Sequence, residues 1–158
     1  MTTNELAVLL DATWFASELT PSTRMQVAAL GRLVAYPEGA LVVREGYPCD
    51  SLGIVVDGRI ALRLAIPGGG QRTILTVNPG DVFGWSAVLP QPVATSSGVA
   101  LVPTQAIVFD GPQLRAELDG NDGLAASLYS RLLVSVSRRL VATRVQLLDL
   151  YQSAGSPW

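Results

Sequence analysis

Few side chains in this sequence could carry out acid–base or nucleophilic chemistry. The 158 residues include no histidine and only one cysteine, so the commonest general base and the commonest transition-metal ligand are both missing. Cys49 cannot form an internal disulfide, and we expect it to be an unreactive buried thiol. Ser86 lies in Gly-Trp-Ser-Ala-Val, which does not match the Gly-x-Ser-x-Gly motif of hydrolases. The carboxylates are scattered singly in predicted turns, without a close pair for proton transfer. The sequence predicts no catalytic residue and no metal site.

The composition fits one folded domain over residues 1–158. Hydrophobic residues make up 49% and charged residues 15% of the chain, which is typical of a globular protein with a single core. The net charge of -2 gives no general attraction for nucleic acid or for an anionic membrane. The N-terminus does not resemble a signal peptide, and no apolar run is long enough to span a membrane. We therefore expect a cytoplasmic protein with no direct contact to DNA or membrane.

Three kinds of segment would have to position any site. Residues 1–33 are predicted to form short helices, with Thr20 capping the helix that begins at Pro21. Residues 34–109 show about eight short β-type runs separated by turn residues, which favours a roll, sandwich or jelly roll. Asp57-Gly58 lies between two of these runs and predicts a hairpin. Residues 110–152 are predicted to be helical, with Asp110 as a cap, and residues 153–158 form a tail.

The last predicted helix carries two apolar stripes. One follows spacings of four and three residues, as in a coiled coil, and consists of Tyr129, Leu133, Val136, Leu140, Thr143, Leu147 and Leu150. The second lies to one side and consists of Leu128, Leu132, Val141, Val145 and Leu148. Packing on one β-roll needs one stripe, so the second favours a homodimer through this helix. The alternative is a wide apolar face that packs only on its own domain.

Four arginines also follow the predicted helix: Arg131, Arg138, Arg139 and Arg144. A basic stripe can contact nucleic acid, but on a long helix it more often forms a solvated face, which is the interpretation we favour here.

Several short motifs occur in a specific order along the β-type region. They are Tyr36-Pro37-Glu38-Gly39, Arg44-Glu45-Gly46-Tyr47, Asp50-Ser51-Leu52, Val56-Asp57-Gly58-Arg59 and Pro79-Gly80-Asp81-Val82-Phe83-Gly84. Together, over residues 14–150, the chain resembles the cyclic-nucleotide-binding domain of catabolite-activator-type regulators. The resemblance implies a mainly β fold, a double-stranded β-helix of the jelly-roll or cupin-like type, with short N-terminal helices and a long C-terminal dimerisation helix. It also implies a regulatory function in signal transduction.

The same resemblance implies a phosphate-binding cassette. Its candidate ligand-binding residues here are Gly80, Asp81, Val82, Phe83, Gly84, Trp85, Ser86, Val93, Ala94, Thr95, Ser96 and Ser97. In the family, a glutamate binds the ribose and an arginine neutralises the cyclic phosphate. Trp85 stands in place of that glutamate, and Val93-Ala94 supplies no arginine before Thr95. Losing both anchors would cost about 3–5 kcal/mol of binding free energy.

Three hypotheses fit the altered cassette. In the first, the pocket is closed, and the domain acts as a dimeric signalling or scaffold module, with a protein partner as a further option. In the second, Trp85 and the nearby hydroxyls bind another small ligand. In the third, a cyclic nucleotide still binds, its phosphate held by backbone N–H groups and a distant arginine such as Arg72. No cofactor is required by any of them. A cupin-like enzyme is disfavoured by the absence of histidine, and the few residues beyond Tyr151 are too short for a helix-turn-helix module.

Overall fold

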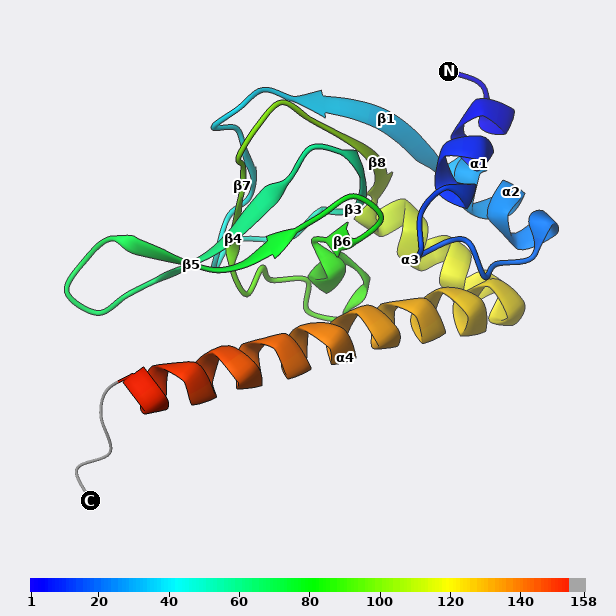
Figure 1. Cartoon of the computed structure of the whole chain (residues 1–158). Helices are drawn as coiled ribbons and strands as arrows, with labels where there is room; N and C mark the ends of the chain where they lie inside the picture. Colours follow the sequence, from blue (N-terminus) through cyan, green and yellow to red (C-terminus); the bar gives the residue numbers. More distant parts are fainter. Residues whose placement is uncertain (154–158) are drawn as a thin grey trace.

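The computed structural model describes residues 1–153 and consists of a β-roll with helices at one side (Figure 1). Two helices precede the roll, α1 (Thr3–Asp11) and α2 (Pro21–Leu30). The strands are β1 (Gly31–Tyr36), β2 (Leu41–Val43), β3 (Ser51–Asp57), β4 (Ile60–Ala65), β5 (Gln71–Val77), β6 (Val82–Phe83), β7 (Ser97–Ala100) and β8 (Thr104–Asp110). A short 3-10 helix, η1 (Trp85–Val88), follows β6, and α3 (Gly111–Gly120) and α4 (Asp122–Ser153) follow β8. The predicted tail lies outside the described residues except for Ser153.

The strands form two antiparallel sheets of four strands each. Their orders are β1-β8-β3-β6 and β2-β7-β4-β5. This arrangement confirms the predicted jelly-roll architecture and the predicted number of about eight strands. The loop from β5 to β6 carries the chain back to the first sheet, next to α4 (Figure 1).

The hairpin predicted at Asp57-Gly58 was wrong. β3 and β4 belong to different sheets, so this turn passes from one sheet to the other instead of joining paired neighbours. Gly58 has a φ of 89°, and a Cβ there would lie 2.5 Å from Thr104 Oγ1. Thr104 Oγ1 accepts a hydrogen bond from the backbone N–H of Arg59 at 3.2 Å, which holds the turn against the first residue of β8. The hairpin is instead β4–β5, whose loop contains Gly68.

The predicted helix caps are confirmed. Thr20 accepts a hydrogen bond from the backbone of Thr23 at 3.2 Å, and Asp110 accepts one from the backbone of Gln113 at 2.9 Å. The predicted end of the N-terminal helical region at residue 33 was wrong, because β1 begins at Gly31. Gly31 pairs with Phe109 of β8, and a Cβ there would lie 2.7 Å from the side chain of Ile107. A tertiary strand pairing therefore ends the helix, which the local pattern does not indicate.

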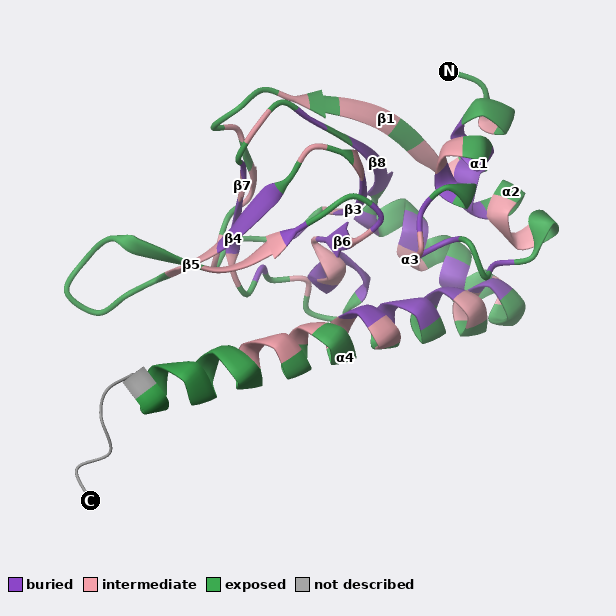
Figure 2. Ribbon diagram, viewed as in Figure 1, coloured by how far each residue is buried: buried purple, intermediate pink, exposed green. Residues whose placement is uncertain are grey.

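The core lies between the helices and the first sheet, with a second, smaller cluster inside the roll. Phe15, Leu52, Phe109 and Leu128 are among its largest fully buried side chains. The burial of α4 changes along its length, from buried near α3 to exposed toward its C-terminal end (Figure 2). Among the described residues, no helix combines the length and apolarity that a membrane span needs.

Candidate functional site

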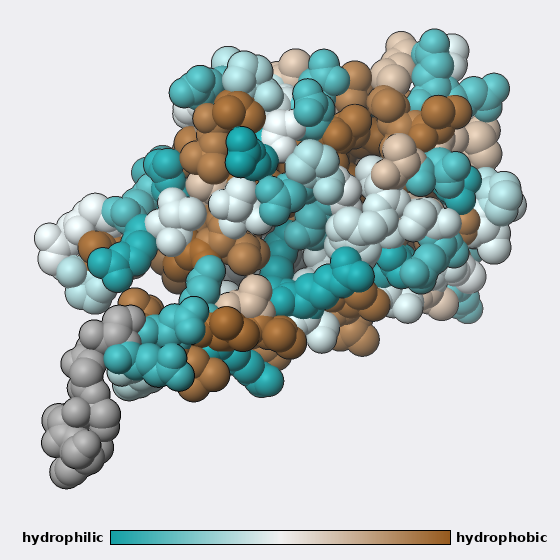
Figure 3. All heavy atoms as spheres, in the orientation of Figure 1, coloured by the Kyte–Doolittle hydropathy of each residue, from teal (hydrophilic) through white to brown (hydrophobic). Residues whose placement is uncertain are grey.

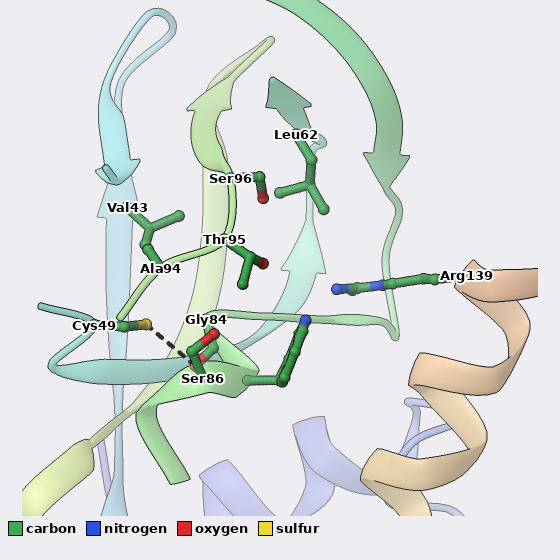
Figure 4. Close-up of a pocket in the computed structure, with 10 residues that line it drawn as sticks. Val43, Cys49, Leu62, Gly84, Ser86, Ala94, Thr95, Ser96 and Arg139 are labelled. Carbon is green, nitrogen blue, oxygen red and sulfur yellow. Dashed lines mark hydrogen bonds between the residues drawn. The ribbon is translucent and has the colours of Figure 1, made fainter. Parts of the chain in front are cut away.

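The cassette segment forms a tight turn between β6 and η1. Gly84 has a φ of 68°, and a Cβ at this position would lie 2.2 Å from the carbonyl oxygen of Ser51. Only glycine fits such a left-handed position this close to another backbone. The turn brings the start of η1 beside the segment that precedes β7, and a small pocket lies between the two (Figure 4).

Six of the twelve predicted ligand-binding residues line this pocket: Gly84, Trp85, Ser86, Ala94, Thr95 and Ser96. The other lining residues are Val43, Cys49, Leu62 and Arg139. Val82 and Phe83 point into the core, Val93 is exposed, and Ser97 is buried, where its hydroxyl accepts from the backbone N–H of Glu45 at 3.0 Å. Gly80 and Asp81 lie in the loop toward α4 and do not line the pocket.

The pocket is very small. Its volume is about 20 Å³, where a single water molecule needs at least about 10–15 Å³. Pockets that hold drug-sized ligands are typically about 300–1,000 Å³. The half-buried Trp85 side chain packs against the main core cluster and lines the pocket at the same time. In this conformation there is no space for a sugar, a cyclic phosphate and a base.

The positive charge in the pocket comes from α4. The Arg139 side chain extends from the helix into the pocket, and it is the only arginine lining it among residues 1–153 (Figure 4). Its Nη2 donates a hydrogen bond to the carbonyl oxygen of Val82, and Asp81 Oδ1 lies 3.6 Å from the same nitrogen. Its Nε is buried without a hydrogen-bond partner among the described residues. Burial lowers the pKa of Arg139, and the nearby Asp81 carboxylate raises it in part.

The prediction that the four arginines of this helix form a solvated face was therefore wrong for two of them, Arg131 and Arg139. Arg139 is only 12% exposed, and Arg131 donates from Nε to the carbonyl oxygen of Phe15 at 2.9 Å and pairs with Glu18. Arg138 lies 4.1 Å above the ring of Trp14. Arg139 was not predicted as a site residue, because the family resemblance places the cation within the cassette. The available signal was the spacing of Arg131, Ser135 and Arg139, which are four residues apart and so share one helix face.

Asp81 connects the cassette loop to this polar face of α4. Its carboxylate accepts a hydrogen bond from Ser135 Oγ at 2.9 Å and another from its neighbour's backbone N–H, that of Val82, at 2.8 Å. Ser135 is fully buried by this contact. The position of α4 is thus fixed directly on the loop that opens the cassette.

Cys49 lies at the wall of the pocket. It is buried, as predicted, and its Sγ donates weakly to the carbonyl oxygens of Gly84 at 3.4 Å and Ser51 at 3.6 Å. Burial raises the pKa of the thiol, so at neutral pH it stays protonated and poorly nucleophilic.

The predicted dimer seam and the residues that pack on the domain lie on different faces of α4. Leu128 and Leu132 are buried against the domain, whereas most of the seam is exposed: Tyr129, Leu133, Leu140, Leu147 and Leu150. Val136 and Thr143 are half-buried. Val141, Val145 and Leu148 of the second stripe are also exposed, because α4 extends beyond the domain that covers its first half.

The β-roll, the glycine-framed cassette turn and the long following helix define a sensor domain of the cyclic-nucleotide-binding type. The family model for the cyclic nucleotide-binding domain matches residues 33–121, more than half of the chain, and the chain belongs to this family. Its fold is that of a regulatory domain related to the catabolite-activator-type regulators.

The comparisons with individual proteins agree with this assignment. The chain is 28% identical over 117 residues to a "CRP-like cAMP-activated global transcriptional regulator" of Mycobacterium tuberculosis strain H37Rv, covering 74% of this chain and 50% of that protein. It therefore spans about half the length of this curated relative. A cyclic nucleotide-binding domain from Methylobacillus flagellatus KT has the same fold, with a TM-score of 0.78, 21% identity, and coverage of 93% of this chain and 83% of that one. A putative cyclic nucleotide-binding protein from Geobacter metallireducens GS-15 gives a TM-score of 0.73 at 24% identity, covering 89% and 98%.

Proposed function

We propose that this chain is a non-catalytic regulatory domain that acts as a homodimer through α4, with a cassette that does not take a cyclic nucleotide in the family's usual manner. A cytoplasmic location is part of the proposal, because the curated relative is named as a global transcriptional regulator. Direct DNA contact by this domain is not part of it. Two of the four arginines on α4 are committed to contacts inside the domain, which leaves no continuous basic stripe there.

The observation that carries the proposal is the division of α4 into two halves. Leu128 and Leu132 are buried against the domain, whereas five of the seven seam residues are exposed in the monomer. Leu133, the second residue of the seam, is 70% exposed, and Leu140, in its middle, is 50% exposed. Brown, apolar side chains lie along this part of the molecule in the space-filling view (Figure 3). Exposed apolar residues at heptad spacing are the pattern that pairs helices in a coiled coil.

The cassette supports the second part of the proposal by its size and its charge. The pocket of about 20 Å³ is lined by Trp85 where the family's glutamate would stand, and the guanidinium of Arg139 reaches into it. A cyclic nucleotide would have to displace Trp85 and Arg139 and would find no carboxylate for its ribose. Both requirements reduce affinity.

The oligomeric state tests the proposed homodimer. In size-exclusion chromatography with light scattering, the wild-type chain is expected to have the mass of a dimer. Leu140→Glu places a charge in the seam and is expected to produce monomers, since the buried charge would cost several kcal/mol in the interface. Val145→Glu is the matched control. Val145 lies on the same half of α4 and is 51% exposed, against 50% for Leu140, but is off the seam. A wild-type monomer, or equal dissociation of both variants, would contradict the proposed seam.

A further inference from the structure

Three apolar side chains on the C-terminal half of α4 are exposed and lie outside the proposed dimer seam. Val141, Val145 and Leu148 are 56%, 51% and 61% exposed, in the part of the helix that the domain does not cover (Figure 2). We refer to these three residues as the distal stripe. Spacings of four and three residues place side chains on one face of a helix, and they are the spacings at which helices pair.

Neither the domain nor the seam covers the distal stripe. An α-helix turns by about 100° per residue, so the stripe lies about 140° around α4 from the centre of the seam. The domain faces a third side of this half of the helix, where Gln146 and Asp149 line a groove with β5. A second α4 paired at the seam would therefore leave the distal stripe exposed.

The residue types of the distal stripe favour burial against another helix. Valine loses side-chain freedom in a helix and is a poorer helix former than alanine, glutamate or lysine. At exposed positions, Val141 and Val145 therefore add neither to the stability of α4 nor to its solubility. Between paired helices, in contrast, β-branched side chains pack well at the contact positions.

The charges beside the distal stripe are mainly positive. Arg138 stands three residues before Val141, on the same face, and is exposed while it stacks on Trp14 at 4.1 Å. Arg144 is exposed and forms no hydrogen bond or ion pair with any of residues 1–153. Asp149 lies on the side toward β5. A second copy paired in parallel through this face would bring Arg138 opposite itself, whereas a helix with carboxylates would complement both arginines.

We propose that the distal stripe is a docking site for an amphipathic helix of a partner protein that carries acidic residues beside its apolar face. The apolar side chains of that helix pack on Val141, Val145 and Leu148, and its carboxylates pair with Arg138 and Arg144. The site does not depend on the proposed homodimer. A monomer offers one such face, and a dimer paired at the seam offers one on each α4.

The test uses a labelled synthetic peptide of about three heptads, long enough to form a helix, with valine and leucine at the contact positions and glutamate beside them. Fluorescence anisotropy of this peptide is measured while the full chain is added. Saturable binding is expected with a Kd of about 10–100 µM and one peptide per chain. A matched peptide with lysine in place of glutamate is expected to bind at least about tenfold more weakly. Sodium chloride at about 0.5 M is expected to weaken binding of the glutamate peptide.

Two equally exposed positions of α4 provide the matched variants. Val145→Gln is expected to weaken binding of the glutamate peptide by about tenfold, because it removes apolar contact in the centre of the distal stripe. Leu140→Gln changes a seam residue that is 50% exposed, against 51% for Val145, and is expected to leave peptide binding unchanged. Arg144→Gln is expected to weaken binding of the glutamate peptide severalfold without weakening that of the lysine peptide.

Three results would overturn the proposal. They are an absence of saturable binding, equal effects of Val145→Gln and Leu140→Gln, and a tetramer of the free chain that disappears in Val145→Gln. The last result would mean that the distal stripe pairs with a second copy. Failure of the proposed homodimer is a separate observation, a wild-type monomer in light scattering, and peptide binding by that monomer would still support the docking site.

Discussion

Asp81 of the cassette loop and Ser135 of α4 are 54 positions apart in the sequence, yet the Ser135 hydroxyl donates to the Asp81 carboxylate at 2.9 Å. The cassette is the segment in which the family resemblance places the ligand, and α4 is the element proposed here to pair two copies of the chain. A direct hydrogen bond between them means that the two parts of the domain cannot move independently without breaking it. Together with Arg139, which reaches the pocket from the same helix, this contact joins the cassette to α4.

Asp81→Ala is expected to destabilise the domain by about 2–3 kcal/mol, because it leaves the buried Ser135 hydroxyl and the backbone N–H of Val82 without their acceptor. Urea unfolding measures the change. Asp119→Ala, at an exposed position in α3, is the control and is expected to change stability by less than about 0.5 kcal/mol. Equal effects of the two substitutions would show that the Asp81 contact contributes nothing.

Arg131→Met is expected to cost about 2–4 kcal/mol of stability. It removes hydrogen bonds to the carbonyl oxygens of Trp14 and Phe15 and the ion pair with Glu18, and it leaves the buried carbonyl oxygen of Phe15 without this donor. Arg144→Met changes an exposed arginine of the same helix and is expected to stay within about 0.5 kcal/mol of the wild type. Thermal unfolding of the two variants side by side provides the comparison. A small loss in Arg131→Met would mean that the arginine face is solvated after all.

Comparing Gly84→Ala with Gly39→Ala distinguishes two causes of lost stability, a steric clash of the new Cβ and the strain of a left-handed backbone. Both glycines have positive φ, but a Cβ at Gly84 would lie 2.2 Å from Ser51 O, whereas a Cβ at Gly39 would meet nothing within 4 Å. Gly39→Ala is expected to cost about 1 kcal/mol, the price of a left-handed alanine. Gly84→Ala is expected to cost clearly more, since the cassette turn must also move. If the two losses of stability measured in urea are equal, the close approach at Gly84 is not a constraint.

The thiol of Cys49 gives a pH dependence with a defined sign. Burial raises its pKa in the folded state, so the unfolded chain releases this proton at lower pH than the folded chain does. The contribution to stability is complete below the unfolded thiol pKa of about 8.5 and is lost as pH rises from there through the folded value. Tyr36, whose pKa is also raised by burial, adds a further loss near and above its ordinary value of about 10. Cys49→Ala is therefore expected to reduce the fall in stability between about pH 8.5 and 10, measured by urea unfolding at each pH. An unchanged slope in this variant would contradict the assignment.

Much of the fold could be predicted from local signals. Caps such as Thr20 and Asp110 act within three residues of where they stand, and the turn glycines divide the strands in the order that the family resemblance implies. The boundary at Gly31 and the sheet change after Asp57 could not be predicted, because both are decided by packing against β8, distant in the sequence. Asp-Gly favours a reversal of the chain but does not say which strand the reversed chain will pair with.

The backbone turn and the hydroxyls of the candidate site could be predicted from the sequence, but its arginine could not. The glycines and hydroxyls of the cassette are contiguous in the sequence and could be found by motif. Arg139 enters the pocket from α4 and stands more than forty residues beyond the cassette in the sequence, and no local pattern connects the two. Its burial depends on how α4 crosses the roll, which is a property of the whole tertiary structure.

Isothermal titration of the full chain with cyclic AMP tests the central claim most directly. We predict no measurable heat of binding up to about millimolar nucleotide, since Trp85 and Arg139 occupy the cassette and neither family anchor is present. A saturable isotherm with a Kd in the low micromolar range and one nucleotide per chain would contradict the account. Such binding would mean that the pocket opens and holds the nucleotide tightly without the family's glutamate and arginine.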